Sequence, residues 1–152
     1  MKKLKVGDKA PDFSAMSDSG EKIKLSDFKK SKLVLYFYPK DMTPGCTAQA
    51  CNLTDNYEFL LKNNYKIIGV SADSIERHRK FKEKYSIPFP LISDEDHSVL
   101  LSYGVWGPKK FMGRTYDGIL RTTFVIDEKG IIEQIIEKVN TKDHTNQLLN
   151  KE

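Results

Sequence analysis

A run of six apolar residues at positions 33–38, ended by Pro39, constrains the fold more than any other feature of the sequence. A strand that is apolar on both faces belongs inside a sheet that is covered on both sides, as the strands of parallel sheets are. Residues 66–71 predict a second buried strand, and the segment between the two has the pattern of one long helix. This strand–helix–strand order predicts a crossover connection between parallel strands at the centre of the fold.

The remaining segments predict a mixed α/β fold around that crossover. Residues 13–16 and 22–25 flank a turn sequence and predict an N-terminal β-hairpin extension, after which Ser26 and Asp27 should cap a short helical turn. The later elements that the pattern predicts are a helix over 75–85 capped by Ser74, a strand at 91–93, a helix at 96–103, an antiparallel hairpin of 122–126 and 131–138, and a final helix capped by Thr141.

Length and charge exclude several classes of protein. A chain of 152 residues that is 39% hydrophobic suits one domain, residues 1–152, with its own core. The 25 basic and 21 acidic residues are interspersed, so we expect no nucleic-acid partner, and the basic stretch 77–84 should form a solvated helix face. The apolar runs are too short to cross a bilayer, and no apolar signal segment follows the N-terminal lysines. We therefore expect a cytoplasmic protein that does not bind membranes.

Cys46 and Cys51 are the only cysteines in the chain. Cys46 follows the first buried strand at the point where a helix should begin, and the free amides and positive dipole of a first helical turn favour the reactive thiolate. In a reducing cytosol, two cysteines five residues apart are better explained by redox cycling or metal binding than by a permanent disulfide. The three histidines, His78, His97 and His144, lie in polar, helix-like contexts without metal-ligand spacing, so we assign no metal.

Helical periodicity places the two thiols on different faces of the predicted helix. At about 100° per residue, Cys46 lies on an apolar face that continues through positions 50, 53, 57, 60 and 61, whereas Cys51 falls on the polar side. Five residues of ideal helix separate the two Cα atoms by roughly 8.7 Å, and a disulfide requires less than about 7 Å. A bond between Cys46 and Cys51 would therefore require the first helical turns to unwind.

The segment around the cysteines resembles the active-site signature of the peroxiredoxins. Pro39, Thr43 and Cys46 stand in the spacing Pro-x-x-x-Thr-x-x-Cys, and the second cysteine follows five residues later. With the segment Arg-Thr-Thr-Phe-Val-Ile-Asp at 121–127, the chain resembles the bacterioferritin comigratory protein branch, also called the peroxiredoxin Q type. The resemblance covers nearly the whole chain. It implies a thioredoxin-like α/β fold and the reduction of hydrogen peroxide or organic hydroperoxides.

The resemblance also implies a role for each cysteine. Cys46 is the expected nucleophile, whose thiolate attacks the terminal peroxide oxygen and becomes a sulfenic acid. Cys51 is expected to resolve that sulfenic acid as an intramolecular disulfide. Thioredoxin or a similar dithiol protein would then reduce the disulfide, and no bound cofactor is required. The small chain has no long tail to embrace a partner, which favours a monomer.

Other residues must assist the helix terminus, which contributes only about 0.3–1 kcal/mol, or about 2 kcal/mol in favourable geometry, to stabilising an anion. Arg121 is the expected cation, because its planar donors can contact the sulfur and a peroxide oxygen together. Arg114 is the rival and is expected to be structural. The Thr43 hydroxyl can accept from the peroxide and donate to sulfur or oxygen, while Pro39 can end the strand and shield the thiolate.

Two other functions stay open at this point. A thiol-disulfide oxidoreductase on the same fold is disfavoured because the chain lacks Cys-x-x-Cys. A redox-inactive binding or chaperone module does not explain why Thr43, Cys46 and Arg121 occur together.

Overall fold

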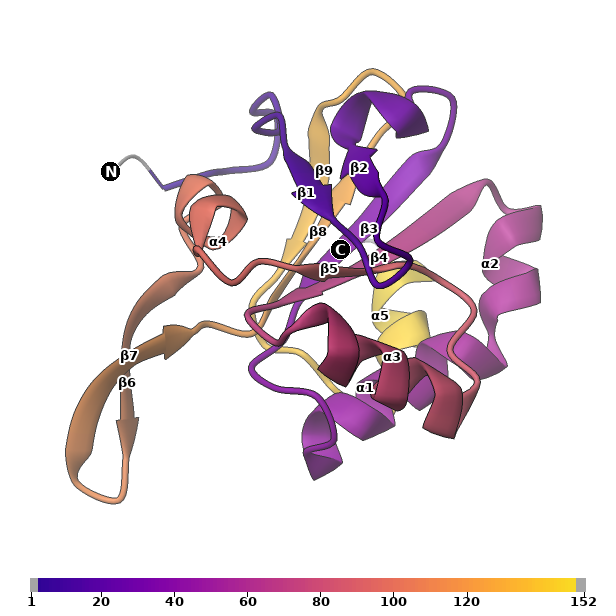
Figure 1. Cartoon of the computed structure of the whole chain (residues 1–152). Coiled ribbons are helices and arrows are strands. Elements are labelled where there is room, and N and C mark those ends of the chain that lie inside the picture. Colours follow the sequence, from indigo (N-terminus) through magenta and orange to yellow (C-terminus); the bar gives the residue numbers. More distant parts are fainter. Residues whose placement is uncertain (1–2, 150–152) are drawn as a thin grey trace.

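The computed structural model describes residues 3–149, and a mixed five-stranded sheet forms its centre (Figure 1). The strands, in spatial order, are β5 (Leu91–Ser93), β4 (Tyr65–Ser71), β3 (Lys32–Phe37), β8 (Thr122–Ile126) and β9 (Ile132–Ile136). β3, β4 and β5 run parallel, whereas β8 pairs antiparallel with β3 and β9 pairs antiparallel with β8. The predicted crossover and the predicted late hairpin are both present, so the mixed α/β class is confirmed.

The β3 strand lies at the centre of the core, as its continuous apolar sequence predicted. The side chains of residues 33–38 are at most 1% exposed. They alternate between the two faces of the sheet, with Leu35 and Phe37 on one face and Val34 and Tyr36 on the other. The strand ends at Phe37, which brings the following residues to the edge of the sheet where α1 begins.

Helices cover one face of the sheet, and the N-terminal hairpin and a short helix cover the other. The first face carries α1 (Pro44–Asp55), α2 (Tyr57–Lys62), α3 (Ile75–Tyr85) and α5 (His144–Leu149). The second carries β1 (Ser14–Met16), which pairs with β2 (Lys22–Lys24), and α4 (Ser98–Ser102). The predicted N-terminal β-hairpin extension is therefore confirmed. Within residues 3–149, the helices are all too short or too polar to span a membrane.

The single long helix predicted after β3 is wrong, because the segment forms two helices. Asn56 separates α1 from α2 and has a ψ of 11°. Its side-chain amide donates to the carbonyl of Asn52 at 2.8 Å, a local bond that competes with regular helical hydrogen bonding. Leu60 is fully buried, as the periodicity predicted, whereas Leu61, which the periodicity also placed on the Cys46 face, is exposed.

Three helix boundaries also differ from the prediction. The short 3-10 helix η1 (Leu25–Phe28) begins before Ser26, and the Asp27 carboxylate accepts from the Lys24 amide at 3.0 Å. The α4 helix is shorter than predicted, because the buried Asp94 carboxylate accepts from the amides of its first turn. The α5 helix begins at His144, three residues after Thr141, because Asn140 first forms a turn with the amides of residues 142 and 143.

A second hairpin, formed by β6 (Trp106–Phe111) and β7 (Arg114–Ile119), was missed by the sequence analysis. It extends away from the rest of the molecule (Figure 1). Met112 and Gly113 form its two-residue turn, and both have a positive φ, as tight hairpin turns with this twist require. The sequence carries no Asn-Gly turn signal there, and the first strand contains Pro108, a residue type that strands disfavour.

Candidate active site

Cys46 lies in the first turn of α1, directly after the chain leaves the central strand β3. Thr43 is the N-cap residue, with an extended backbone at φ −78° and ψ 153°, and Pro44 begins the helix. The Thr47 amide donates to the Thr43 carbonyl at 2.9 Å, so the amides of Gly45 and Cys46 are the free ones of this turn. The Cys46 residue is 1% exposed and lies in the first helical turn, at the positive end of the helix dipole.

Arg121 supplies a cation in direct contact with the sulfur. It stands immediately before β8, and its Nη2 donates to Cys46 Sγ at 3.1 Å. A Cβ atom at position 45 would lie 3.4 Å from the same Nη2, so Gly45 leaves the space that the guanidinium occupies. The antiparallel pairing of β8 with β3 brings Arg121, 75 residues away in sequence, to the start of α1.

Gln49 is a site residue that the sequence analysis missed. Its side chain is fully buried, and its Oε1 accepts from Arg121 Nη1 at 2.7 Å. Because a guanidinium only donates, the Gln49 oxygen must face Arg121. Its Nε2 then has no hydrogen-bond partner among the described residues. The signal that could have found Gln49 is its position three residues after Cys46, a polar residue on the apolar face of the helix.

Thr43 lies beside the helix start, but one of its two predicted hydrogen bonds is unavailable in this conformation. Its hydroxyl donates to the Lys40 carbonyl at 2.8 Å. The oxygen lone pairs can still accept from a peroxide, whereas donation to sulfur would require the Lys40 bond to break. Pro39 is half-buried between the end of β3 and this turn. Met42, within the turn, has a φ of 69°, a left-handed conformation that costs a non-glycine residue roughly 1–2 kcal/mol.

Cys51 lies on the same intact helix as Cys46 but is half-buried, and both cysteines are free thiols. Burial and the negative charge of Asp55 raise the pKa of the Cys51 thiol, so it is protonated at neutral pH. The neighbouring residue, Asn52, ties this part of α1 to the chain that enters α5. Its Oδ1 accepts from the amide and the hydroxyl of Thr145, both at 2.8 Å, and its Nδ2 donates to the Lys142 carbonyl at 3.2 Å.

The sequence over residues 6–135 matches the model of the AhpC/TSA family. The chain belongs to this family. It is 48% identical to peroxiredoxin Bcp of Escherichia coli strain K12 over 150 residues, which cover 99% of this chain and 96% of that protein. It is also 48% identical to peroxiredoxin Bcp of Bacillus subtilis strain 168, over 96% of this chain and 93% of that protein.

Solved structures agree with this assignment. A peroxiredoxin Q variant from Xylella fastidiosa superimposes with a TM-score of 0.92 at 30% identity, over 99% of this chain and 96% of that one. A bacterioferritin comigratory protein from Xanthomonas campestris, studied for alkyl peroxide reduction, superimposes with a TM-score of 0.84 at 33% identity. The match covers 90% of this chain and 87% of that one. The expected thioredoxin-like fold and the resemblance to the peroxiredoxin Q branch are confirmed. The chain is a thiol-dependent peroxidase.

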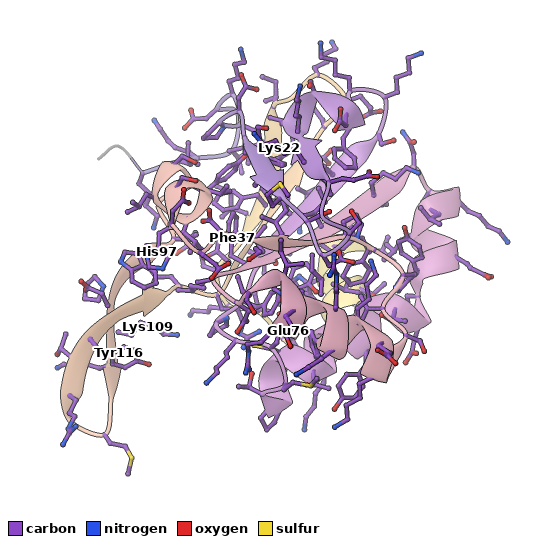
Figure 2. The ribbon with its side chains drawn as sticks, viewed as in Figure 1. Lys22, Phe37, Glu76, His97, Lys109 and Tyr116 are labelled. Atoms are coloured by element: carbon purple, nitrogen blue, oxygen red, sulfur yellow. The ribbon has the colours of Figure 1, made fainter. Side chains whose placement is uncertain are left out.

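Lys109 places a second cation near the site of this peroxiredoxin, and it comes from the hairpin that was not predicted. Figure 2 shows Lys109 on the β6–β7 hairpin. Burial lowers the pKa of Lys109, and the charge of Arg121 lowers it further, whereas a negative Cys46 acts in the opposite direction. Lys109 and Arg121 line one hollow, whose other residues include Val105, Trp106 and Leu120. Arg114, the rival of Arg121, is exposed on β7 of the same hairpin.

Two histidines of the peroxiredoxin are fully buried, contrary to the polar surroundings that the sequence suggested. His78 lies on α3, and His144 begins α5. Gln147 Oε1 accepts from the Asn140 amide at 2.8 Å, so the same oxygen must accept from His144 Nδ1, also at 2.8 Å. Because burial also lowers the pKa of His144, the ring is neutral at neutral pH, and its Nε2 accepts from the Thr123 hydroxyl at 2.9 Å.

Acid should weaken the fold through His144. Burial lowers its pKa and the Arg121 charge lowers it further, although the Gln147 hydrogen bond opposes them. The unfolded chain has an ordinary histidine pKa of about 6.5, so the contribution of His144 to stability is complete above that pH and is lost as the pH falls through the lower folded value. Urea unfolding at a series of pH values should show a shallower acid decline for His144→Gln than for the unchanged protein. An identical decline would contradict this assignment.

Proposed function

We propose that Cys46 is the cysteine that peroxide oxidises and that Cys51 resolves the product, with Arg121, Thr43 and Pro39 completing the site. The observation that carries this proposal is the 3.1 Å hydrogen bond from Arg121 Nη2 to Cys46 Sγ at the start of α1. A buried thiol between a guanidinium and free helix amides is the setting in which a thiolate is both stable and reactive.

The first step is an attack by the Cys46 thiolate on the terminal oxygen of the peroxide. The S–O bond forms as the O–O bond breaks, and the leaving oxygen takes a proton and departs as water or an alcohol. Arg121 and the amides of Gly45 and Cys46 face the negative charge that develops on oxygen. The Thr43 hydroxyl accepts from the peroxide O–H, because its own proton already binds Lys40. Gln49 holds the Arg121 guanidinium in place, and Pro39 limits access of water.

The second step joins the two cysteines. Cys51 sulfur attacks the Cys46 sulfenic acid, and the hydroxyl group leaves as water. Because both residues lie within α1, where an ideal helix holds the Cα atoms roughly 8.7 Å apart, the start of the helix must unwind. The bonds of Asn52 to Lys142 and Thr145 oppose that unwinding, so the segment entering α5 should loosen with it.

The substrates and partners of the proposed cycle follow from its chemistry. The hollow that Lys109 and Arg121 line is largely apolar elsewhere, which suits the organic part of a hydroperoxide, while hydrogen peroxide needs no such space. An internal disulfide requires an external dithiol, so thioredoxin or a similar protein in a reducing cytoplasm would restore the enzyme. We further propose that residues 1–152 work as a monomer and as one domain.

Stopped-flow oxidation of the fully reduced protein tests this function. Hydrogen peroxide or an alkyl hydroperoxide should oxidise Cys46 much faster than a small organic disulfide does, because the site stabilises charge that develops on oxygen. Faster reaction with the small disulfide would indicate a thiol-disulfide oxidoreductase instead. No reaction with either oxidant would leave a redox-inactive binding module.

A further inference from the structure

A buried histidine–aspartate pair lies next to the turn that carries Thr43. His78 on α3 and Asp41 in the turn are both fully buried, and His78 Nδ1 is 2.6 Å from Asp41 Oδ2. His78 Nε2 lies 2.8 Å from the carbonyl oxygen of Ile92 on β5. The hydroxyl of Tyr38, at the end of β3, donates to Asp41 Oδ1 at 2.6 Å. This pair takes no part in the chemistry proposed for Cys46.

The partners of the His78 ring determine its charge. The Ile92 carbonyl can only accept, so Nε2 carries a proton, and Nδ1 faces a carboxylate oxygen. Burial alone would lower the pKa of His78. The net shift is upward, because burial is outweighed by the hydrogen bond and charge of Asp41, the hydrogen bond to the Ile92 carbonyl and the charge of Asp73. Asp41, Asp73 and His78 also have ligand atoms within 4.8 Å of one another, but a metal would have to displace one of these short ring hydrogen bonds.

Asp41 is held by its backbone as well as by its side chain. Its amide donates to Asp73 Oδ2 at 2.8 Å, and its carbonyl accepts from Arg77 Nη2 at 3.4 Å. Arg77 Nε in turn donates to Asp73 Oδ1 at 3.0 Å. The next residue is Met42, whose left-handed backbone leads directly into the Thr43 N-cap. The anchors on Asp41 therefore maintain an unfavourable backbone conformation that sets where α1 begins.

We propose that His78 is a positioning residue for peroxide reduction, whose cationic ring holds Asp41 and, through Asp41, the turn that presents Thr43 beside Cys46. The inference rests on the proposed roles of Cys46 and Thr43. When the ring loses a proton, it can no longer donate both to the Asp41 carboxylate and to the Ile92 carbonyl, so one of the two anchoring bonds is lost and the turn loosens. Four groups face His78: Asp41 in the turn, Tyr38 directly after β3, Asp73 in the β4–α3 connection and the Ile92 carbonyl on β5. Arg77, which binds Asp73, lies beside His78 on α3.

The first test is His78→Gln, which cannot carry a charge and cannot make both ring hydrogen bonds. The rate constant for Cys46 oxidation by hydrogen peroxide should fall roughly tenfold at neutral pH, because small displacements of a reacting group are costly. The thiolate fraction of Cys46 should stay within about twofold, since Arg121 and the helix amides are untouched. As the pH rises through the raised pKa of His78, the ratio of the variant rate to the unchanged rate should rise towards one, because the native ring then loses its own charge.

Two further variants separate positioning from general stability. In Asp41→Asn, the amide can donate to a neutral His78 Nδ1 while its oxygen accepts from Tyr38, so every hydrogen bond of the pair is kept without charge. Its rate should lie within about threefold of the unchanged protein at neutral pH and should exceed it at alkaline pH. The matched control is His97→Gln, which replaces a half-buried histidine that stacks on Trp106. The ratio of its oxidation rate to that of the unchanged protein should not depend on pH.

The results discriminate clearly between the possibilities. A His78→Gln ratio that is below one but constant with pH would mean a purely structural role and would overturn the proposal, as would an Asp41→Asn profile identical to that of the unchanged protein. Nuclear magnetic resonance of the His78 ring gives a readout independent of activity: the ring should be cationic at neutral pH, and a neutral ring would also overturn the proposal. If peroxide failed to oxidise Cys46 in the unchanged protein, the proposed function itself would be wrong, whatever the charge of His78.

Discussion

Peroxide reduction should be abolished in Cys46→Ser, with turnover falling below detection. A serine hydroxyl is not ionised near neutral pH and is a poor nucleophile, so the same helix amides and the same Arg121 cannot make it attack an O–O bond. The loss should appear both with hydrogen peroxide and with an organic hydroperoxide, since both begin with the same attack. Activity of even a tenth of the unchanged protein would remove Cys46 from its proposed role.

Cys51→Ser is the matched control, because it removes the other thiol of the same helix. This variant should consume one equivalent of peroxide and stop at the sulfenic acid, since the first step does not involve Cys51. Mass spectrometry under limiting peroxide should find one added oxygen in the variant and the loss of two hydrogens in the unchanged protein. A Cys51→Ser protein that takes up no oxygen at Cys46 under the same conditions would contradict the assignment.

Arg121→Lys should slow the peroxide step by about tenfold or more. Lysine keeps the positive charge, but it cannot bind Cys46 Sγ and Gln49 Oε1 from one planar group as Arg121 does, at 3.1 Å and 2.7 Å. The thiolate fraction at neutral pH should also fall, and ultraviolet absorbance of the thiolate measures it directly. Rapid mixing with peroxide then gives the rate for the same sample.

Arg114→Lys is the control for Arg121, because it makes the same chemical change on the exposed strand β7. Its rate constant and thiolate fraction should match those of the unchanged protein. A larger loss in Arg114→Lys than in Arg121→Lys would require the two assignments to be exchanged.

The elements that could be predicted from sequence are those whose pattern is local and continuous. The apolar run of β3 and the Pro39 that follows it indicated a buried strand, and the helix start at Cys46 followed from them. The break at Asn56 could not be predicted from periodicity, because the apolar spacing continues across it while the side chain bonds to Asn52. The β6–β7 hairpin was missed because Pro108 and the Met112 turn lack the usual strand and turn signals.

The site was predicted unevenly for a similar reason. Arg121 was chosen because of the family resemblance, since nothing local connects it with a cysteine 75 residues away. His78 lies in the most basic stretch of the chain, where its neighbours Arg79 and Lys80 are exposed as expected. Its burial depends on Asp41, which is 37 residues away, so no local pattern contains it. Long-range partners decide these cases, and a single sequence does not display them.

Formation of the Cys46–Cys51 disulfide should unwind the start of α1, and hydrogen exchange read by mass spectrometry measures that unwinding. Reduced protein and protein oxidised with one equivalent of peroxide should be compared in one experiment, with the Cys46–Cys51 linkage verified in the same digest. Protection of residues 46–54 should fall sharply on oxidation and return on reduction, and residues 142–145 should follow because Asn52 binds them. Equal protection in both states, with the internal disulfide present, would mean that the disulfide forms without unwinding α1.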